Sequence, residues 1–384
     1  MDRSSNRIKQ LYEKEGQSAW QDDISRDMLN EGTILTAIEE TGVRGLTSNP
    51  TIFEKAIAAG TAYDEEIGGL LERDLDAHDI FEAVAVRDIQ AATDLFRPLY
   101  DASEGGDGFV SIEVSPLGAR DAAVTTTDAR RLWSAVDRPN LMVKIPGTAE
   151  ALPVIQQMLE EGININITLL FSVPAYERVA RAYIAALKAR QAAGLPIDRI
   201  ASVASFFVSR VDTLVDKFLD ERIEATSDAT QKGWLESLKG KAAIANAKIA
   251  YQSFERLFSG AEWESLAAAG ASVQRPLWAS TSVKNPALPD TRYVDELIGP
   301  HTVNTMPRPT ITAFLDHGTV ARTVDRNVSD AYKTMEDLAA AGIDIDAVTA
   351  QLEDEGIASF AKSYDSLLQG VAEKRSQLAG AAAD

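Results

Sequence analysis

Short apolar runs alternate with longer stretches of helical periodicity along most of this chain, and this alternation is the strongest constraint on its fold. In Val208–Ile223, for example, apolar residues recur mostly every three or four positions, which is typical of a helix with one buried face. Repeated strand–helix units predict a parallel sheet, and eight of them predict closure into an α/β, (β/α)8 barrel of the TIM type. The eight candidate strands are Ser18–Asp22, Arg44–Ser48, Phe109–Val114, Leu141–Ile145, Ile163–Leu169, Ser202–Val208, Pro276–Ser280 and Thr302–Met306.

The main structural alternative is an open, doubly wound sheet. Such a sheet usually carries a glycine-rich phosphate loop, and neither G-x-G-x-x-G nor a Walker A pattern is present. Roughly 65 residues separate the sixth and seventh candidate strands, which is more than a simple crossover needs, and Lys239–Phe258 is the clearest helix among them. We therefore expect a single α/β-barrel domain over residues 1–384, with a helical insertion at about 210–275 and C-terminal helices at about 310–384.

Composition narrows the possible chemistry. The chain has no cysteine and three histidines, which excludes disulfides and cysteine nucleophiles and disfavours a metal site. A net charge of −20 argues against nucleic acid as a partner, because such binding depends on a basic surface. No apolar run is long enough to span a membrane and no signal peptide is evident, so we expect a cytoplasmic protein. An anionic substrate would need a local cluster of cations.

One lysine, Lys144, stands inside the apolar run Leu141–Ile145, just before a Pro-Gly break. Burying an ammonium group costs free energy unless the group is paired or deprotonated. A deprotonated lysine is an amine nucleophile that can form a Schiff base with a carbonyl substrate. The alternative is a strand-end lysine whose long side chain carries its charge out to water.

Polar and ionisable residues gather at the carboxyl end of every candidate strand, where barrel active sites form. Each type has an ordinary explanation, since an aspartate can cap a helix, an asparagine can make a turn, and a glutamate can pair with a lysine. Their convergence on one mouth is what favours an active site. The residues are Asp22, Asp23, Thr47, Ser48, Asn49, Glu113, Lys144, Asn166, Thr168, Ser205, Arg210, Ser280, Ser282, Lys284, Asn304 and Thr305.

These groups fit a lysine-based aldol chemistry. The amine of Lys144 can attack a ketone, and the carboxyl of Glu113 can move protons through water while the carbinolamine dehydrates. Asp22 can take the hydroxyl proton that allows a carbon–carbon bond to break, and the protonated imine then accepts the electron pair. A phosphate can be held by three further residues, Ser205, Arg210 and Lys284.

At these positions the chain resembles transaldolase, in the long bacterial form of that class I, Schiff-base aldolase family. The resemblance runs in order from residue 20 to residue 307. It implies an α/β barrel without metal or organic cofactor, and transfer of a dihydroxyacetone unit from sedoheptulose 7-phosphate to glyceraldehyde 3-phosphate in the non-oxidative pentose phosphate pathway. The matching stretches are Trp20–Arg26, Gly45–Phe53, Ser111–Val114, Leu141–Thr148, Asn164–Ser172, Ala204–Asp212, Ala279–Asn285 and Val303–Pro307.

The resemblance also implies roles for individual residues. Lys144 looks like the Schiff-base lysine, and Glu113 and Thr168 look like the partners that place the catalytic water. Asp22 looks like the acid/base for bond cleavage, with Asp23 as an alternative. The substrate-binding residues are Asn49 and Asn166 for the dihydroxyacetone hydroxyls and Ser205, Arg210 and Lys284 for the phosphate. The last of these positions is often arginine in the shorter relatives, and lysine lacks the bidentate fork of arginine.

Two other functions stay open. A fructose-6-phosphate aldolase would use the same lysine but release free dihydroxyacetone. A silent barrel would bind sugar phosphates without turnover, which is disfavoured because Lys144, Glu113 and Asp22 are all present. We expect sugar phosphates as binding partners and a monomer or a homodimer.

Overall fold

The computed structural model describes residues 6–58, 60–73 and 75–383. Seven parallel strands form one curled sheet in the order β1-β7-β6-β5-β4-β3-β2, which leaves β1 and β2 at its two edges. The strands are β1 (Gln17–Gln21), β2 (Val110–Glu113), β3 (Leu141–Pro146), β4 (Ile165–Leu170), β5 (Ser202–Phe207), β6 (Arg275–Ala279) and β7 (Thr302–Met306).

The segment around Leu46 joins the two edges of this sheet. Leu46 pairs in parallel with Gln21 on one side and with Val110 on the other. The N–H of Leu46 donates to the carbonyl of Phe109 at 2.9 Å, and the N–H of Thr47 donates to the carbonyl of Gln21 at 2.9 Å. The strands and this segment together form an α/β barrel of the TIM type, as the strand–helix alternation predicts.

The predicted strand Arg44–Ser48 therefore lies in the barrel wall: the N–H of Arg44 donates to the carbonyl of Ala19 at 2.8 Å, and the N–H of Ser111 donates to the carbonyl of Leu46 at 3.0 Å. A Cβ atom on Gly45 would lie 2.5 Å from the Trp20 ring, so the backbone approaches this indole closely. Helix α4 (Pro50–Ala58) then begins at once, which draws the chain out of the barrel wall.

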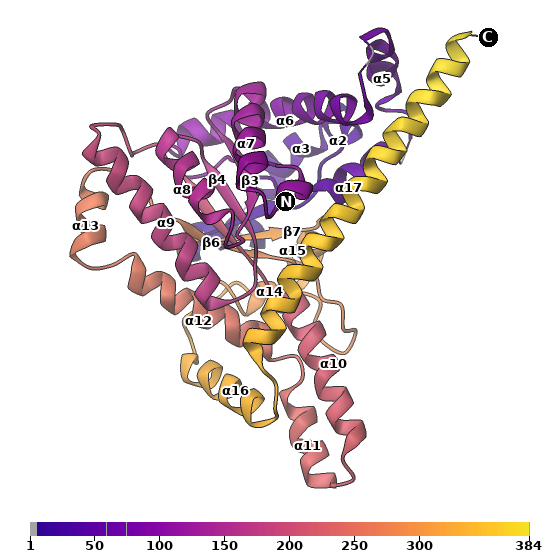
Figure 1. Ribbon diagram of the computed structural model, residues 1–384. Helices are drawn as coiled ribbons and strands as arrows, with labels where there is room; N and C mark the ends of the chain where they lie inside the picture. The colour runs from indigo at the N-terminus through magenta and orange to yellow at the C-terminus, as the bar shows by residue number, and fades with distance from the viewer. Residues whose placement is uncertain (1–5, 59, 74, 384) are drawn as a thin grey trace.

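Helices surround the strands (Figure 1), and this cover explains why the strands read as apolar runs, because a parallel sheet is buried on both faces. The described helices that precede β5 are α1 (Arg7–Glu15), α2 (Arg26–Asn30), α3 (Thr33–Thr36), η2 (Ala37–Thr41), α4, α5 (Asp64–Leu70), η3 (Leu71–Arg73), α6 (Ala77–Ala102), η4 (Pro116–Gly118), α7 (Ala122–Val136), α8 (Leu152–Glu161) and α9 (Val173–Ala192).

The stretch between β5 and β6 is helical and comprises α10 to α13. The predicted helix Lys239–Phe258 corresponds to α12 (Ala242–Leu257). In Figure 1, α10 and α11 form a hairpin that projects away from the barrel. The helices after β5 are α10 (Ser209–Ala225), α11 (Ala229–Leu238), α12, α13 (Ala261–Ala268), α14 (Arg292–Asp295), α15 (Arg308–His317), α16 (Val328–Ala340) and α17 (Ile345–Ala383).

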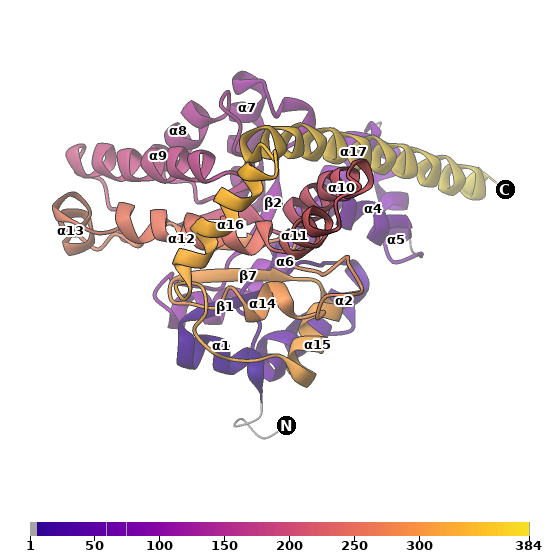
Figure 2. The same cartoon turned by 90° about the horizontal axis from the view of Figure 1, so that it is seen from below.

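Helix α17 is long and runs diagonally across the molecule to the C-terminus, as Figures 1 and 2 show from two directions. A Cβ atom on Gly356 would lie 2.9 Å from Leu169 Cδ2 and 3.7 Å from Arg210 Nη1. The absence of a side chain at Gly356 thus lets α17 lie close to the carboxyl end of β4. There Leu169 has a positive φ of 59°, and the pairing of β4 with β5 shifts register between Ile167 and Leu170.

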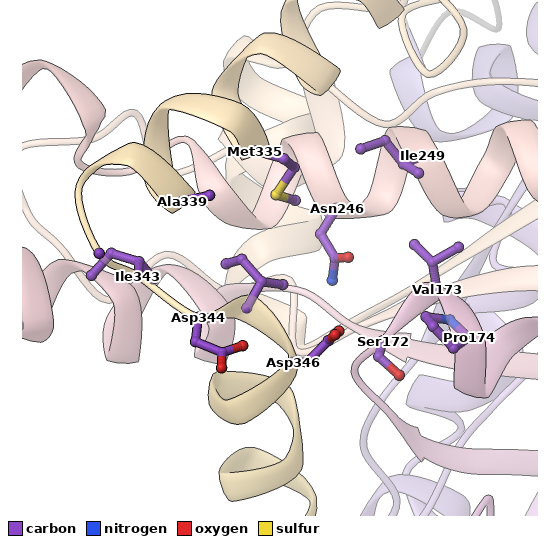
Figure 3. A pocket seen from close by; sticks show the side chains of 12 residues that line it. Ser172, Val173, Pro174, Asn246, Ile249, Met335, Ala339, Ile343, Asp344 and Asp346 are labelled. Carbon is purple, nitrogen blue, oxygen red and sulfur yellow. The ribbon is translucent and has the colours of Figure 1, made fainter.

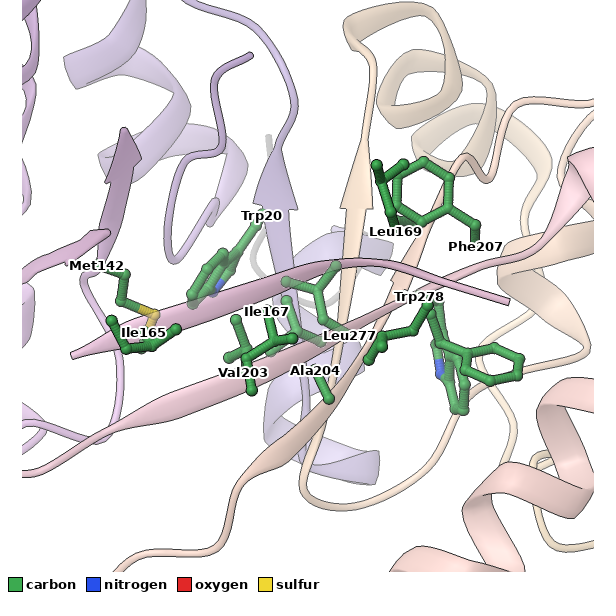
Figure 4. Close-up of a cluster of buried hydrophobic side chains, with 14 of the residues drawn as sticks. Trp20, Met142, Ile165, Ile167, Leu169, Val203, Ala204, Phe207, Leu277 and Trp278 are labelled. Carbon is green, nitrogen blue, oxygen red and sulfur yellow. The ribbon is translucent and has the colours of Figure 1, made fainter. Parts of the chain in front are cut away.

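The interior of the barrel is packed below the site. Trp20 and Met142 lie two residues before Asp22 and Lys144, on the same faces of their strands, and both are buried (Figure 4). The Trp20 Nε1–H donates to Asp107 at 2.9 Å, a carboxylate that also pairs with cations near the amino ends of the strands.

None of the described helices has the apolar stretch needed to span a bilayer.

Candidate active site

Lys144 lies in the middle of β3 with only 5% of its surface exposed, so the alternative of a lysine that extends to water is wrong. Its Nζ donates to the carbonyl of Ser48 at 3.3 Å. The same atom lies 3.6 Å from Glu113 Oε2, because β2 and β3 pair with these two residues side by side. The ammonium group is therefore buried next to one carboxylate inside the barrel.

Glu113 accepts no hydrogen bond on either carboxylate oxygen from the described residues. Burial raises the pKa of Glu113 to about 7, although the charge of Lys144 opposes the rise. A carboxyl group with such a pKa can both donate and accept a proton near neutral pH. Thr168 on β4 is fully buried, and its hydroxyl likewise has no partner in the described part of the chain. Both groups thus keep free hydrogen-bonding capacity.

Asp22 follows β1, and burial raises the pKa of its carboxyl, while Lys144 and a hydrogen bond from Thr47 oppose the rise. Thr47 Oγ1 donates to Asp22 Oδ1 at 2.6 Å. Asp23 has a different environment: burial also raises its pKa, but the cations that oppose this are Arg308 and Lys55. Of the two neighbouring aspartates, Asp22 is therefore the one that interacts with Lys144.

Asn166 pairs with Lys144 across β3 and β4. Its Nδ2 donates to Ser111 Oγ at 3.0 Å, and its Oδ1 accepts from Ser205 Oγ at 2.7 Å. These two contacts fix the orientation of the amide. Asn49, which is half-buried, accepts from the N–H of Ile52 at 3.0 Å through its Oδ1, so its amide N–H groups are the ones left for a ligand.

Arg210 is the second residue of α10 and is half-buried, with its guanidinium carbon 5.2 Å from the centre of the Phe207 ring. Burial lowers its pKa, and the charge of Glu355 opposes this fall. Lys284 is exposed, and its Nζ donates to Ser282 Oγ at 2.9 Å. Within the described residues, no carboxylate forms an ion pair with either cation. Such unpaired cations can serve an anionic ligand.

Sequence comparisons identify the family of this chain. The family model of transaldolase/fructose-6-phosphate aldolase matches residues 19–371, which is most of the chain. The chain belongs to this family. Among similar proteins, the transaldolase of Trichodesmium erythraeum is 48% identical over 94% of this chain and 96% of its own length. The transaldolase of Thermobifida fusca is also 48% identical, with the same coverage, and transaldolase 2 of Nostoc sp. is 47% identical over 93% of this chain and 94% of its own length.

In this transaldolase-family member, Ser205, one of the three predicted phosphate ligands, donates its hydroxyl to Asn166 Oδ1 at 2.7 Å. Ser209, which precedes Arg210, bonds through its hydroxyl to Ser280 at 3.0 Å, and Ser280 lies at the start of the segment that carries Lys284. Ser205 therefore lies with the amide groups inside the barrel.

Three residues with site contacts had no assigned role at the sequence level. Thr47 and Thr305 appeared only among the strand-end residues, and their hydroxyl oxygens lie 2.6 Å apart. Ser111 lies two positions before Glu113, and this spacing places both side chains on one face of β2. Ser111 could have been predicted as a site residue by taking, for each strand-end residue, the residue two positions earlier on the same face of the strand.

A cavity of about 550 Å³ lies between the start of α9 and helices α12, α16 and α17 (Figure 3). Its polar lining includes Ser172, Asn246, Asp344 and Asp346. None of the catalytic or substrate-binding candidates contributes to this lining, so the cavity is separate from the site around Lys144 in this family member.

Proposed function

We propose that the protein is a transaldolase that works through a Schiff base on Lys144. It transfers a dihydroxyacetone unit from sedoheptulose 7-phosphate to glyceraldehyde 3-phosphate, which gives erythrose 4-phosphate and fructose 6-phosphate. The observation that carries this proposal is the buried Lys144 Nζ, 3.6 Å from Glu113 Oε2 and within the electrostatic reach of Asp22. A nucleophile and two carboxyl groups thereby meet at one mouth of the barrel.

Imine formation uses Lys144, Glu113 and Thr168. The carboxylate of Glu113 first takes a proton from the ammonium group of Lys144. The Nζ lone pair then attacks the C2 ketone of the donor, and a proton moves from the nitrogen to the former carbonyl oxygen to complete the carbinolamine. Glu113, with its pKa of about 7, protonates the leaving hydroxyl through a water that it holds together with Thr168. Water departs and the nitrogen lone pair forms the C=N bond, which leaves a cationic imine. The same residues return the proton when water later hydrolyses the product imine.

Bond cleavage uses Asp22. Its carboxylate takes the proton of the C4 hydroxyl, the C3–C4 bond breaks, and the electron pair moves into the imine to give an enamine. Erythrose 4-phosphate leaves as the aldehyde. Glyceraldehyde 3-phosphate then arrives, the enamine carbon attacks its aldehyde, and Asp22 returns the proton to the new hydroxyl. Asp22 is favoured over Asp23 because Asp22 interacts with Lys144, whereas Asp23 faces Arg308 and Lys55.

The remaining polar residues bind the substrate. The amides of Asn49 and Asn166 hold the hydroxyls of the dihydroxyacetone unit, and Ser205 holds the Asn166 amide in place. Arg210 and Lys284 bind the phosphate, a role that fits two cations that form no ion pair with any described carboxylate. Arg210 is the stronger contributor, because a half-buried guanidinium can form paired hydrogen bonds with phosphate oxygens.

Borohydride trapping tests the proposed function. Reduction in the presence of fructose 6-phosphate should stop activity and leave a dihydroxyacetone-derived mass on the peptide that contains Lys144. The second buried lysine, Lys248, whose Nζ donates to the carbonyl of Arg326 at 3.0 Å, should stay unlabelled. A label on Lys248, or no label at all, would disprove the Schiff-base assignment. Release of free dihydroxyacetone at the rate of transfer, without an acceptor aldehyde, would instead favour fructose-6-phosphate aldolase.

Phosphate binding gives a second prediction. Arg210→Met should lower kcat/KM for fructose 6-phosphate by about ten- to a hundredfold, which corresponds to the loss of one or two charge-assisted hydrogen bonds. The loss should appear mainly as a higher KM, and unphosphorylated fructose should be affected little. Lys217→Met removes an exposed cation from the same helix and serves as the control. An equal loss with both sugars would argue against a phosphate contact.

We also propose that the enzyme acts in the cytoplasm as a monomer or a homodimer. A chain without cysteine is compatible with a reducing compartment. Light scattering of the purified full chain decides between the two oligomeric states.

A further inference from the structure

Three residues from distant parts of the chain form a line of hydrogen bonds that ends at Asp22. Thr305 Oγ1 lies 2.6 Å from Thr47 Oγ1, and Thr47 Oγ1 lies 2.6 Å from Asp22 Oδ1. We propose that Thr305 is a positioning residue for the cleavage step, which acts on Asp22 through the hydroxyl of Thr47. This inference rests on the proposed role of Asp22 as the acid/base.

The backbone holds all three residues in place. Thr305 pairs with Trp20 across β7 and β1. The N–H of Asp22 donates to the carbonyl of Met306 at 2.9 Å, and the N–H of Thr47 donates to the carbonyl of Gln21 at 2.9 Å. Both threonine side chains are buried, with residue exposures of 4% for Thr305 and 1% for Thr47. Their hydroxyls therefore cannot exchange these partners for bulk water.

The chemistry of the three groups fixes the direction of the hydrogen bonds. An ionised carboxylate only accepts, and each threonine hydroxyl carries one proton. With Asp22 ionised, the proton of Thr47 points to Asp22 Oδ1, so the proton of Thr305 must point to Thr47. Thr305 thus orients the donor of Asp22. A hydrogen bond that is itself reinforced by another donor is also stronger than an isolated one.

The hydrogen bonds from Thr305 to Thr47 and from Thr47 to Asp22 Oδ1 leave Asp22 Oδ2 free to contact the substrate. Of the two carboxylate oxygens, Oδ1 accepts from Thr47, and Oδ2 accepts no hydrogen bond from the described residues. In the cleavage step the proton of the C4 hydroxyl moves to Oδ2, while the electrons of the C3–C4 bond move into the imine. The Thr47 bond to Oδ1 persists throughout, so the carboxyl keeps its orientation in both protonation states.

Three other charged groups also influence the pKa of Asp22, in addition to the hydrogen bonds from the threonines. They are the ammonium of Lys144 on β3, the carboxyl of Glu113 on β2, and the carboxyl of the neighbouring Asp23. Burial raises the pKa of Asp22, and donors to its ionised form oppose that rise. Loss of the Thr305 hydroxyl should therefore leave Asp22 protonated up to a higher pH.

The test compares Thr305→Val, Thr305→Ser and Thr302→Val. Thr302 is a matched control because it is a buried threonine of the same strand, whose hydroxyl donates to the carbonyl of Gly299 at the other end of the barrel. For Thr305→Val we expect kcat for transfer to fall about fivefold, the effect of one buried hydrogen bond. The acidic limb of its kcat–pH profile should move to higher pH. KM for the donor and labelling of Lys144 by borohydride should stay unchanged.

Thr305→Ser keeps the hydroxyl and should restore both kcat and the pH profile, while Thr302→Val should keep the profile of the unmodified enzyme. The inference is overturned if Thr305→Val leaves the position of the acidic limb unchanged, or if Thr302→Val moves it equally. Failure of the proposed function looks different, since the unmodified enzyme would then show no label on Lys144 or no transfer.

Discussion

Lys144→Met should abolish dihydroxyacetone transfer, with a loss of at least about ten-thousandfold in kcat, as is typical when a covalent nucleophile is removed. Methionine has a similar length and is apolar, so it fits the buried position of Lys144 in β3 without a charged group. It has no amine, and no imine can form to accept the electrons of the breaking bond. The measurement is a coupled assay of transfer from fructose 6-phosphate to an acceptor aldehyde.

Lys248→Met is the matched control for this substitution. Lys248 is similarly buried, at 6% exposure against 5% for Lys144, but it lies on α12 and bonds to the carbonyl of Arg326. Its replacement should leave kcat within about twofold, provided that thermal unfolding shows a folded protein. Residual transfer by Lys144→Met above about one per cent of the normal rate would contradict the nucleophile assignment.

Glu113→Gln should lower the rate of imine formation by about a hundred- to ten-thousandfold, the usual contribution of a positioned acid/base group. Glu113 has a folded-state pKa raised to about 7 by burial, so it is protonated below this pH and ionised above it. Dehydration of the carbinolamine needs the protonated form. In the unmodified enzyme, single-turnover imine formation should therefore fall as the pH rises through about 7.

The amide of Glu113→Gln does not titrate, so this inflection should disappear from the variant. Imine formation can be followed by borohydride quenching between about pH 5.5 and 9, a range that brackets the expected ionisation. Asp216→Asn is a suitable control, because burial also raises the pKa of Asp216, to about 6, at a position on α10 where it accepts from the N–H of Gly240. An inflection that survives Glu113→Gln, or one lost in Asp216→Asn, would contradict the assignment.

Agreement between sequence and structure is best where the information is local. The apolar run Leu141–Ile145 becomes β3, and the periodic stretch Val208–Ile223 becomes most of α10. The predicted strand Arg44–Ser48 also lies in the barrel wall, with backbone hydrogen bonds to β1 on one side and to the start of β2 on the other. The close approach of Gly45 to the Trp20 ring could not be predicted from the strand pattern, because this contact is between residues distant in sequence.

The candidate site likewise has features that the sequence predicts and features that depend on tertiary contacts. Strand-end polar residues could be predicted as a group, because the carboxyl ends of parallel strands meet at one mouth of a barrel. Their individual partners could not. The bond of Ser205 to Asn166, and the position of Asp22 rather than Asp23 beside Lys144, depend on strand stagger and on side-chain rotamers in the closed barrel.

The sequence by itself determined the alternation of strands and helices and the placement of a lysine in an apolar run among polar strand ends, since periodicity and residue chemistry are properties of short segments. Only the tertiary structure decided which groups touch. Thr305 and Thr47 are separated by 258 positions in the chain, yet their hydroxyls meet because the Leu46 segment closes the barrel next to β1. Hydrogen bonds act over about 3 Å, and contacts on that scale exist only after the whole barrel has formed.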